Sequence, residues 1–307
     1  MRELKKLYPL ALVNITNRCN LKCQHCFVFR EGNPNKPTEK NEMTTDAMIK
    51  EIKKYKRKYG IFRMLWMGGE PLLRKDVLKQ GVKLFPQNAI TTNGTLPLIN
   101  LGPSIKWVIS IDGPEDINDE IRGKGSFERV IHNLNNLPED FTGDLQCNCV
   151  VTKMNEDCFE ELINILHKET PIRGINLTFY VPKKKDTSEF TWKSLKERDS
   201  TVKKICELKN KYPKFILNNN KVLELMLSQN APQITKDCPV KKIMLPLYLG
   251  NDGFEIPFCC YGNDVDCDLC GSWAVFHLEY IMRLNPGFPF KMTVDTFKKV
   301  TPSGITL

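Results

Sequence analysis

Residues 10–26 read LALVNITNRCNLKCQHC, an apolar segment followed directly by three cysteines in the spacing CxxxCxxC. The apolar part, residues 10–15, predicts a buried β-strand, so Cys19, Cys23 and Cys26 fall in the loop at its carboxyl end. A 4Fe-4S cluster ordinarily takes four cysteine ligands, one for each iron. A triplet with no fourth cysteine in the same loop therefore predicts a cluster site with one iron left open to a small molecule.

Strand-like apolar segments and amphipathic helical segments alternate from this loop as far as residue 179. The alternation predicts a mostly parallel sheet of α/β class, a partial (β/α)6 TIM-like barrel with a small C-terminal cysteine-rich module. The predicted strands are residues 10–15, 61–67, 89–92, 107–111, 147–152 and 175–179, and the predicted helices are 44–59, 76–85, 126–137 and 158–168. We expect the barrel in residues 1–182, a helical connector in 183–236, and the cysteine-rich module with its C-terminal helix and tail in 237–307.

Further motifs follow the second, third and fourth predicted strands, where parallel barrels gather their active-site loops. Glycine, asparagine and proline are common turn formers, so one such motif alone carries little weight. Several of them in register with the cysteine loop predict a single site. The motifs are Gly68-Gly69-Glu70-Pro71, Thr92-Asn93-Gly94 and Asp112-Gly113-Pro114.

The composition excludes two classes of protein. The chain has 12 cysteines in 307 residues, but secreted disulfide scaffolds are short and follow a signal peptide, and here the first apolar stretch is brief and interrupted by Pro9. No run approaches the ~18 apolar residues of a membrane-spanning helix. The net charge of +9 fits solvated faces or attraction to phosphate, and no nucleic acid partner is expected. We therefore expect a reduced, cytoplasmic protein, with a peripheral place at the membrane as the alternative.

The cysteine loop and the GGEP motif resemble those of the radical S-adenosylmethionine (radical SAM) superfamily over about residues 10–180. The hallmark CxxxCxΦC is matched by the three cysteines, with His25 at the usually aromatic position. The resemblance implies that SAM binds the open iron and that an electron from a ferredoxin- or flavodoxin-like donor cleaves it to a 5'-deoxyadenosyl radical. A zinc knuckle is the alternative, but such sites prefer paired CxxC elements and would leave the barrel pattern unexplained.

The same resemblance implies which residues bind SAM. Glycine permits close backbone approach, and a carboxylate is the natural partner of an ammonium group. A lone arginine in a loop is otherwise a surface residue, and this remains the alternative for Arg122. The implied residues are Gly68, Gly69 and Glu70 for the methionine ammonium, Ser110 and Asp112 for the ribose or carboxylate, Arg122 for the carboxylate, and His25 and Asn93 as further contacts, with His25 near the adenine.

Five cysteines between residues 238 and 270 resemble the SPASM or twitch region that follows many radical SAM barrels. Four of them would hold an auxiliary 4Fe-4S cluster, and tetrahedral zinc remains the alternative. The candidate ligands are Cys238, Cys260, Cys267 and Cys270, with Cys259 interchangeable with Cys260. Cys147 and Cys149 lie two apart on one predicted strand and so face the same way. Either both are small buried residues, or Cys149 lines the barrel lumen and acts as a catalytic hydrogen-atom donor or acceptor.

Residues 273–284 bear on the substrate, because this apolar segment is either a helix that packs on the barrel or one that gates an apolar tunnel or touches a membrane. The spacing around Cys238 is also distantly similar to enzymes that build hopanoid and archaeal ether lipids. We therefore expect a long-chain isoprenoid or lipid substrate, with C–C bond formation as one outcome. The alternatives are a peptide or protein maturase, against which the short stretch before residue 10 argues, and a non-catalytic iron–sulfur or zinc scaffold, against which the GGEP motif argues.

Overall fold

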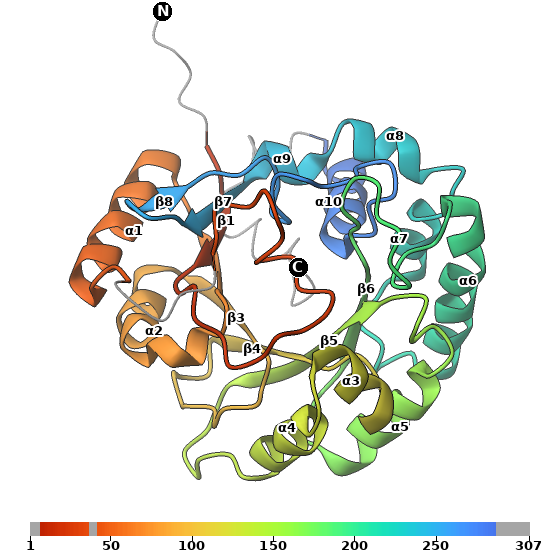
Figure 1. Ribbon diagram of the computed structural model, residues 1–307, viewed down its shortest axis with the longest axis horizontal. Helices are drawn as coiled ribbons and strands as arrows, with labels where there is room; N and C mark the ends of the chain where they lie inside the picture. The colour runs from red at the N-terminus through yellow and green to blue at the C-terminus, as the bar shows by residue number, and fades with distance from the viewer. Residues whose placement is uncertain (1–6, 37–41, 287–307) are drawn as a thin grey trace, which may run out of the picture. The chain divides into compact units, whose positions relative to one another are not determined.

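The computed structural model describes residues 7–36 and 42–286 and forms an α/β fold with an open, mostly parallel sheet, as expected for a partial TIM-like barrel (Figure 1). The strand order is β6-β5-β4-β3-β2-β1-β7-β8, and β7–β8 is the antiparallel pair. All six predicted strands are present. The strands are β1 (Leu10–Asn14), β2 (Arg63–Met67), β3 (Gln87–Thr92), β4 (Ile105–Ser110), β5 (Asp144–Val151), β6 (Ile175–Phe179), β7 (Met244–Leu249) and β8 (Phe254–Glu255).

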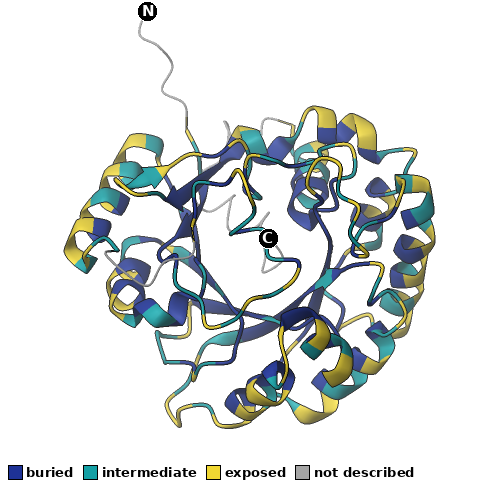
Figure 2. Cartoon of the chain, in the orientation of Figure 1, coloured by how far each residue is buried: buried dark blue, intermediate teal, exposed yellow. Residues whose placement is uncertain are grey.

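The chain divides into two compact units, each discontinuous in sequence. Unit 1 comprises Met1–Ile109, Arg122–Leu145 and Lys241–Asp264, and unit 2 comprises Ser110–Ile121, Gln146–Val240 and Val265–Leu307. Apart from β8, the strands of both units are mostly buried, whereas the helices are buried on one side and exposed on the other (Figure 2).

Unit 1 carries its main helices beside β1, β2 and β3. The predicted helix at residues 44–59 is α1 (Thr45–Tyr59). The side chain of Thr44 caps its start by accepting a hydrogen bond from the amide of Ala47, and Gly60 ends it with φ at 69°. The other helices are the 3₁₀ turns η1 (Pro71–Arg74) and η2 (Val82–Leu84), α2 (Lys75–Gly81) and α4 (Ser126–Asn135), and the short α9 (Pro239–Ile243) ends in this unit.

Unit 2 contains most of β5, β6 and the remaining helices. Phe179 of β6 lies against Trp192 and against Arg198 of α6, so alternate residues of β6 face the helices. The helix α10 packs against β6, α7 and α8, as the packing interpretation of residues 273–284 expects. The helices are α3 (Glu115–Arg122), α5 (Phe159–Glu169), α6 (Leu195–Lys211), α7 (Asn220–Leu225), α8 (Ala231–Lys236) and α10 (Trp273–Leu284).

Two of the elements that were not expected from the sequence bear on the candidate site residues. The helix α3 occupies the segment read as a loop around Arg122, and β7 lies in the stretch read as the start of a loop-rich module. β7 is buried throughout and pairs in parallel with β1, so residues 241–264 belong to unit 1. Pro246 interrupts the strand pattern, but β8 pairs only with Tyr248 and Leu249, so Pro246 lies beyond that pairing, where proline is tolerated.

Within the described residues, no helix has the length and apolar character needed to cross a bilayer. The last part of the expected C-terminal module, residues 287–307, lies outside the described residues.

Candidate active site

The cysteine loop follows β1 in unit 1, with Cys19, Cys23 and Cys26 half-buried. Burial and the negative charges of Glu70, Cys23 and Cys26 raise the pKa of the Cys19 thiol to about 12. A metal cluster binds thiolates and relieves this repulsion, so the residues present fit such a group. No group of three or more His, Cys, Asp or Glu side chains forms a ready metal site among the residues that the structure describes.

The GGE loop after β2 touches the backbone of the cysteine loop. The amides of Gly69 and Glu70 donate to the carbonyl oxygens of Thr16 and Arg18, both at 2.8 Å. A Cβ at Gly69 would collide with the Arg18 carbonyl oxygen, and one at Gly68 would lie 2.8 Å from that of Thr16. In this structure the close approach that requires glycine is therefore to the cysteine loop.

The Glu70 carboxylate is fully buried at the end of β2. It accepts hydrogen bonds from the amide of Leu72 at 3.0 Å, the hydroxyl of Thr92 at 2.7 Å and the amide of Asn93 at 2.8 Å. Burial raises the pKa of Glu70, and these three hydrogen bonds lower it in part. The result is an oriented carboxylate that is suited to an ammonium group.

The loop after β3 also reaches the cysteine loop, through the predicted Asn93 and through Asn20 and Thr95, which the sequence interpretation missed. The side-chain amide of Asn93 donates to the side-chain oxygen of Asn20 at 2.9 Å. The side-chain amide of Asn20 in turn donates to the Thr95 hydroxyl at 2.8 Å. Asn93 also points its amide at the Cys19 sulfur, 4.0 Å away. Asn20 lies inside the CxxxC motif, and this position in the motif could have identified it from the sequence.

Arg122 and His25 are both buried in unit 1, at 7% and 9% exposure. Arg122 ends α3, and its guanidinium lies 4.0 Å from the Cys23 sulfur. This placement argues against the surface alternative for Arg122 and puts a cation beside one of the three predicted cluster ligands.

Ser110 and Asp112 belong to unit 2. Asp112 is fully buried, and its carboxylate accepts the amide of Val150 at 2.8 Å. Its backbone carbonyl accepts the Asn155 amide at 2.7 Å. Asp112 therefore has a structural task within unit 2, holding the loop after β4 to β5.

Cys149 lies on the helix-facing side of β5. In the register with β6 it pairs with Leu177, which shares its face with Phe179, and its sulfur accepts a weak hydrogen bond from Asn155 at 3.8 Å. Cys147 shares this face and donates to the carbonyl of Ile111. A lumenal, hydrogen-transferring Cys149 stays a prediction that this placement does not support.

The opposite face of β5 and β6 is polar. Asn176 donates to Asn148 at 2.9 Å, and both are nearly fully buried. Gln146 and Thr178 share this face by alternation, and Thr178 accepts the amide of Trp273 at 3.0 Å. Unit 2 thus presents amide and hydroxyl groups on the face of β5 and β6 that meets the start of α10.

The C-terminal cysteines are divided between the units. Cys259 and Cys260 belong to unit 1, where the Tyr248 hydroxyl donates to the Cys260 carbonyl at 2.7 Å. Cys238, Cys267 and Cys270 belong to unit 2, where the amide of Cys270 donates to the Cys267 carbonyl at 3.3 Å and closes the CxxC turn.

Arg198 of α6 holds this turn. Its guanidinium is 2% exposed and donates to the carbonyls of Leu269 at 3.3 Å, Cys270 at 3.2 Å and Met226 at 3.0 Å. Burial lowers the pKa of Arg198 to about 10, while the negative charges of Cys270 and Asp199 act in the opposite direction. A buried cation close to the Cys270 thiol fits a thiolate ligand of a metal centre at that position.

Curated relatives with similar sequences include three from different organisms. The Fe-coproporphyrin III synthase of Methanosarcina barkeri is 33% identical over 43% of this chain and 34% of its own length. The serine-type anaerobic sulfatase-maturating enzyme of Bacteroides thetaiotaomicron is 32% identical over 39% and 34%, and a probable GTP 3',8-cyclase of Sulfurisphaera tokodaii is 26% identical over 84% and 82%. The match spans only about a third of the length of the first two relatives.

Similar solved structures cover most of the chain and support the fold. Native anSMEcpe with bound AdoMet aligns with a TM-score of 0.59 at 17% identity over 83% of this chain and 75% of its own. Streptococcus suis SuiB bound to precursor peptide SuiA aligns with a TM-score of 0.59 at 14% identity over 84% and 64%. The family model described as Radical SAM superfamily matches residues 13–166, just over half of the chain. With the cysteine loop and the GGE loop joined as described above, the chain belongs to the radical SAM superfamily.

Proposed function

We propose that the chain is a radical SAM enzyme that modifies a peptide or protein. When bound, the 4Fe-4S cluster and SAM supply, on one-electron reduction, a 5'-deoxyadenosyl radical that abstracts a hydrogen atom from an unactivated C–H bond. The observation that carries this proposal is the direct hydrogen bonding of the cysteine loop to the GGE loop, which holds three candidate iron ligands near a buried carboxylate.

Different residues of unit 1 would bind the cluster and the two charged groups of the methionine part of SAM. Cys19, Cys23 and Cys26 would hold the cluster, Glu70 would accept the methionine ammonium, and Arg122 would hold the methionine carboxylate. Glu70 is suited to its part because three donors fix its orientation before any ligand arrives. In unit 2, Cys238, Cys267 and Cys270 would supply ligands to an auxiliary cluster.

A peptide is favoured over a lipid by the polar face of unit 2. Asn148 and Asn176 place buried amide groups on one face of β5 and β6, and such groups match the polar backbone of a peptide better than an isoprenoid chain. Two of the matched proteins have names that point the same way, since one is a sulfatase-maturating enzyme and one structure contains a precursor peptide, whereas the synthase and the cyclase are named for small molecules. Neither of these two names points to a lipid substrate or to contact with a membrane.

The test of the activity is anaerobic reconstitution with iron and sulfide, followed by SAM and a chemical reductant. We expect 5'-deoxyadenosine from the wild type and from Glu51→Gln, which changes a partly exposed carboxylate on α1 that pairs with Lys54, and strongly reduced product from Glu70→Gln. Absence of 5'-deoxyadenosine from a wild type with an intact cluster overturns the radical reading and favours a non-catalytic scaffold.

The substrate class is tested with two deuterated pools, one of peptides and one of lipids, extracted from cells grown in deuterated medium. When the atom abstracted from the substrate is deuterium, the 5'-deoxyadenosine formed contains that deuterium and has a higher mass. We expect this mass shift with the peptide pool. A shift that occurs with the lipid pool alone contradicts the peptide proposal.

A further inference from the structure

The segment Thr16 to Arg18 joins β1 to Cys19 and is held along both of its edges. On one edge, its carbonyl oxygens accept the amides of Gly69 and Glu70. The amide of Asn17 points the other way, as in an extended strand, and so needs a partner on the second edge.

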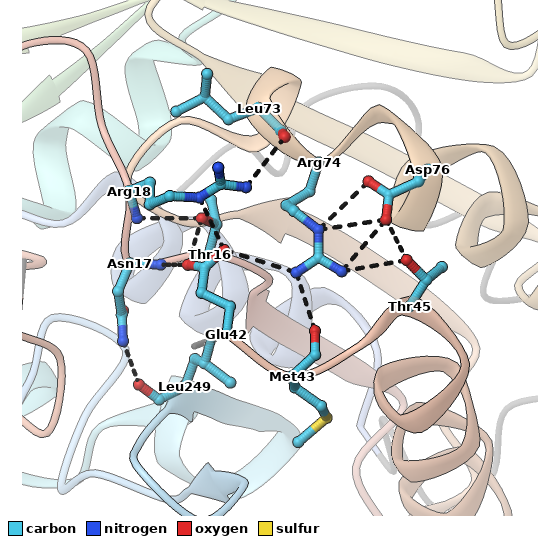
Figure 3. A network of polar contacts seen from close by, with 10 residues as sticks. All are labelled: Thr16, Asn17, Arg18, Glu42, Met43, Thr45, Leu73, Arg74, Asp76 and Leu249. Atoms are coloured by element: carbon cyan, nitrogen blue, oxygen red, sulfur yellow. Dashed lines mark hydrogen bonds and ion pairs between the residues drawn. The ribbon is translucent and has the colours of Figure 1, made fainter. Parts of the chain in front are cut away.

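That partner is the carboxylate of Glu42, a residue that the sequence interpretation did not single out (Figure 3). One oxygen accepts the Thr16 hydroxyl and the Asn17 amide, both at 2.6 Å. The other accepts the guanidinium of Arg18 at 3.0 Å. Glu42 thus takes the place of a neighbouring strand on this edge.

Glu42 is also tied to the segment that follows Glu70. The guanidinium of Arg74 lies 3.6 Å from the Glu42 carboxylate, and both side chains are 8% exposed. Arg74 belongs to η1 and also donates to the Met43 carbonyl at 3.2 Å and to the Thr45 hydroxyl at 3.3 Å (Figure 3). The Glu42 carboxylate is therefore shared between the cysteine loop and the end of the GGE loop.

We propose that Glu42 is a positioning residue that sets the spacing between Cys19 and Glu70, and hence between the open iron and the partner of the SAM ammonium. The inference rests on the proposed function. Glu42 bonds to the residue just before Cys19 and pairs with Arg74, four residues beyond Glu70. A shift of either loop misaligns the two groups that must hold one small ligand together.

The experiment compares Glu42→Gln and Thr16→Val with the surface control Glu51→Gln. Glutamine keeps the shape of Glu42 but loses the charge and turns one acceptor into a donor that faces an arginine. On reconstituted protein, we would measure iron content, the dissociation constant of SAM by calorimetry, and the change that SAM causes in the EPR spectrum of the reduced cluster.

We expect Glu42→Gln to keep its iron, to bind SAM at least about tenfold more weakly and to lose most of the SAM-induced EPR change. Thr16→Val should weaken SAM binding about threefold. SAM affinity within twofold of wild type in Glu42→Gln overturns the proposal, as does loss of iron from Glu42→Gln with unchanged SAM binding in Thr16→Val. Failure of the wild type to bind SAM overturns the proposed function instead.

Discussion

The two groups of cysteines are held in different ways. Cys19, Cys23 and Cys26 lie on one loop of unit 1, and backbone hydrogen bonds and carboxylates tie that loop to its neighbours. The five C-terminal cysteines are divided, two in unit 1 and three in unit 2. The first group is therefore defined by a short contiguous sequence, whereas the second depends on segments that are distant in the chain.

The charges beside the two groups differ as well. A buried glutamate, Glu70, lies near the first group, where a ligand with an ammonium group is expected. A buried arginine, Arg198, lies beside Cys270 of the second group. Within the proposed function, the glutamate suits a cationic ligand bound next to the first metal centre, whereas the arginine suits the thiolate ligands of the second.

The largest effect is expected from Cys23→Ala. The first cluster has three cysteine ligands, so loss of one should remove about four irons and abolish 5'-deoxyadenosine formation. Iron analysis and chromatography of the product measure both effects. A variant that retains full activity would show that the first group is not the cluster site.

Cys270→Ala should remove only the second metal. We expect the reductive cleavage of SAM to persist, while modification of the substrate is lost. Metal analysis distinguishes the two candidates, because loss of iron supports an auxiliary cluster and loss of zinc supports a zinc site. Unchanged metal content would exclude Cys270 as a ligand.

Glu70→Gln should weaken SAM binding by about 10- to 100-fold, the effect of losing one charge-assisted hydrogen bond. In the wild type, affinity should fall as the pH drops through the raised pKa of Glu70, because the protonated form has no charge for the ammonium. Calorimetry at a series of pH values measures this loss of affinity, and Glu70→Gln should not show it.

The same raised pKa affects the stability of the protein without SAM. Between the ordinary pKa of a glutamate and the raised one, the folded state binds more protons than the unfolded state. Its contribution to stability therefore decreases as the pH rises through this window. Denaturant unfolding should show this slope in the wild type and a weaker slope in Glu70→Gln.

Arg198→Met should lower the midpoint potential of an auxiliary cluster by tens of millivolts, because it removes a buried positive charge that favours the reduced form. Redox titration followed by EPR measures this change, with Arg173→Met, at an exposed position of unit 2, as the control. An unchanged midpoint potential in a variant with an intact cluster would show that the charge of Arg198 does not act on the metal.

The smallest effect is expected from Cys149→Ala. Because its sulfur faces the helices of unit 2, we expect a loss of about 1 kcal/mol in stability and turnover within twofold of wild type. Thermal unfolding and turnover measure the two effects. If the Cys149→Ala variant folds and forms 5'-deoxyadenosine but does not modify the substrate, Cys149 has the predicted catalytic role after all.

Much of the fold was predictable because its signals are local. The strand β6 coincides with the predicted residues 175–179, and α1 begins and ends at the caps of Thr44 and Gly60. The strand β7 was not predictable, because Pro246 and the nearby cysteines disguise it and only its pairing with β1 reveals it. The face of Cys149 likewise follows from the register with β6.

By itself, the sequence determined the kind of site to expect after β1 and β2. The three cysteines and the GGE motif are each a short run of residues, and thiols and a carboxylate indicate a metal cluster and an ammonium group. Only the tertiary structure decided what holds these runs together. Glu42 meets Asn17 across 25 positions, and Asn17 meets the carbonyl of Leu249 across 232. Hydrogen bonds between such distant residues leave no spacing pattern in the sequence, so they appear only once the chain has folded.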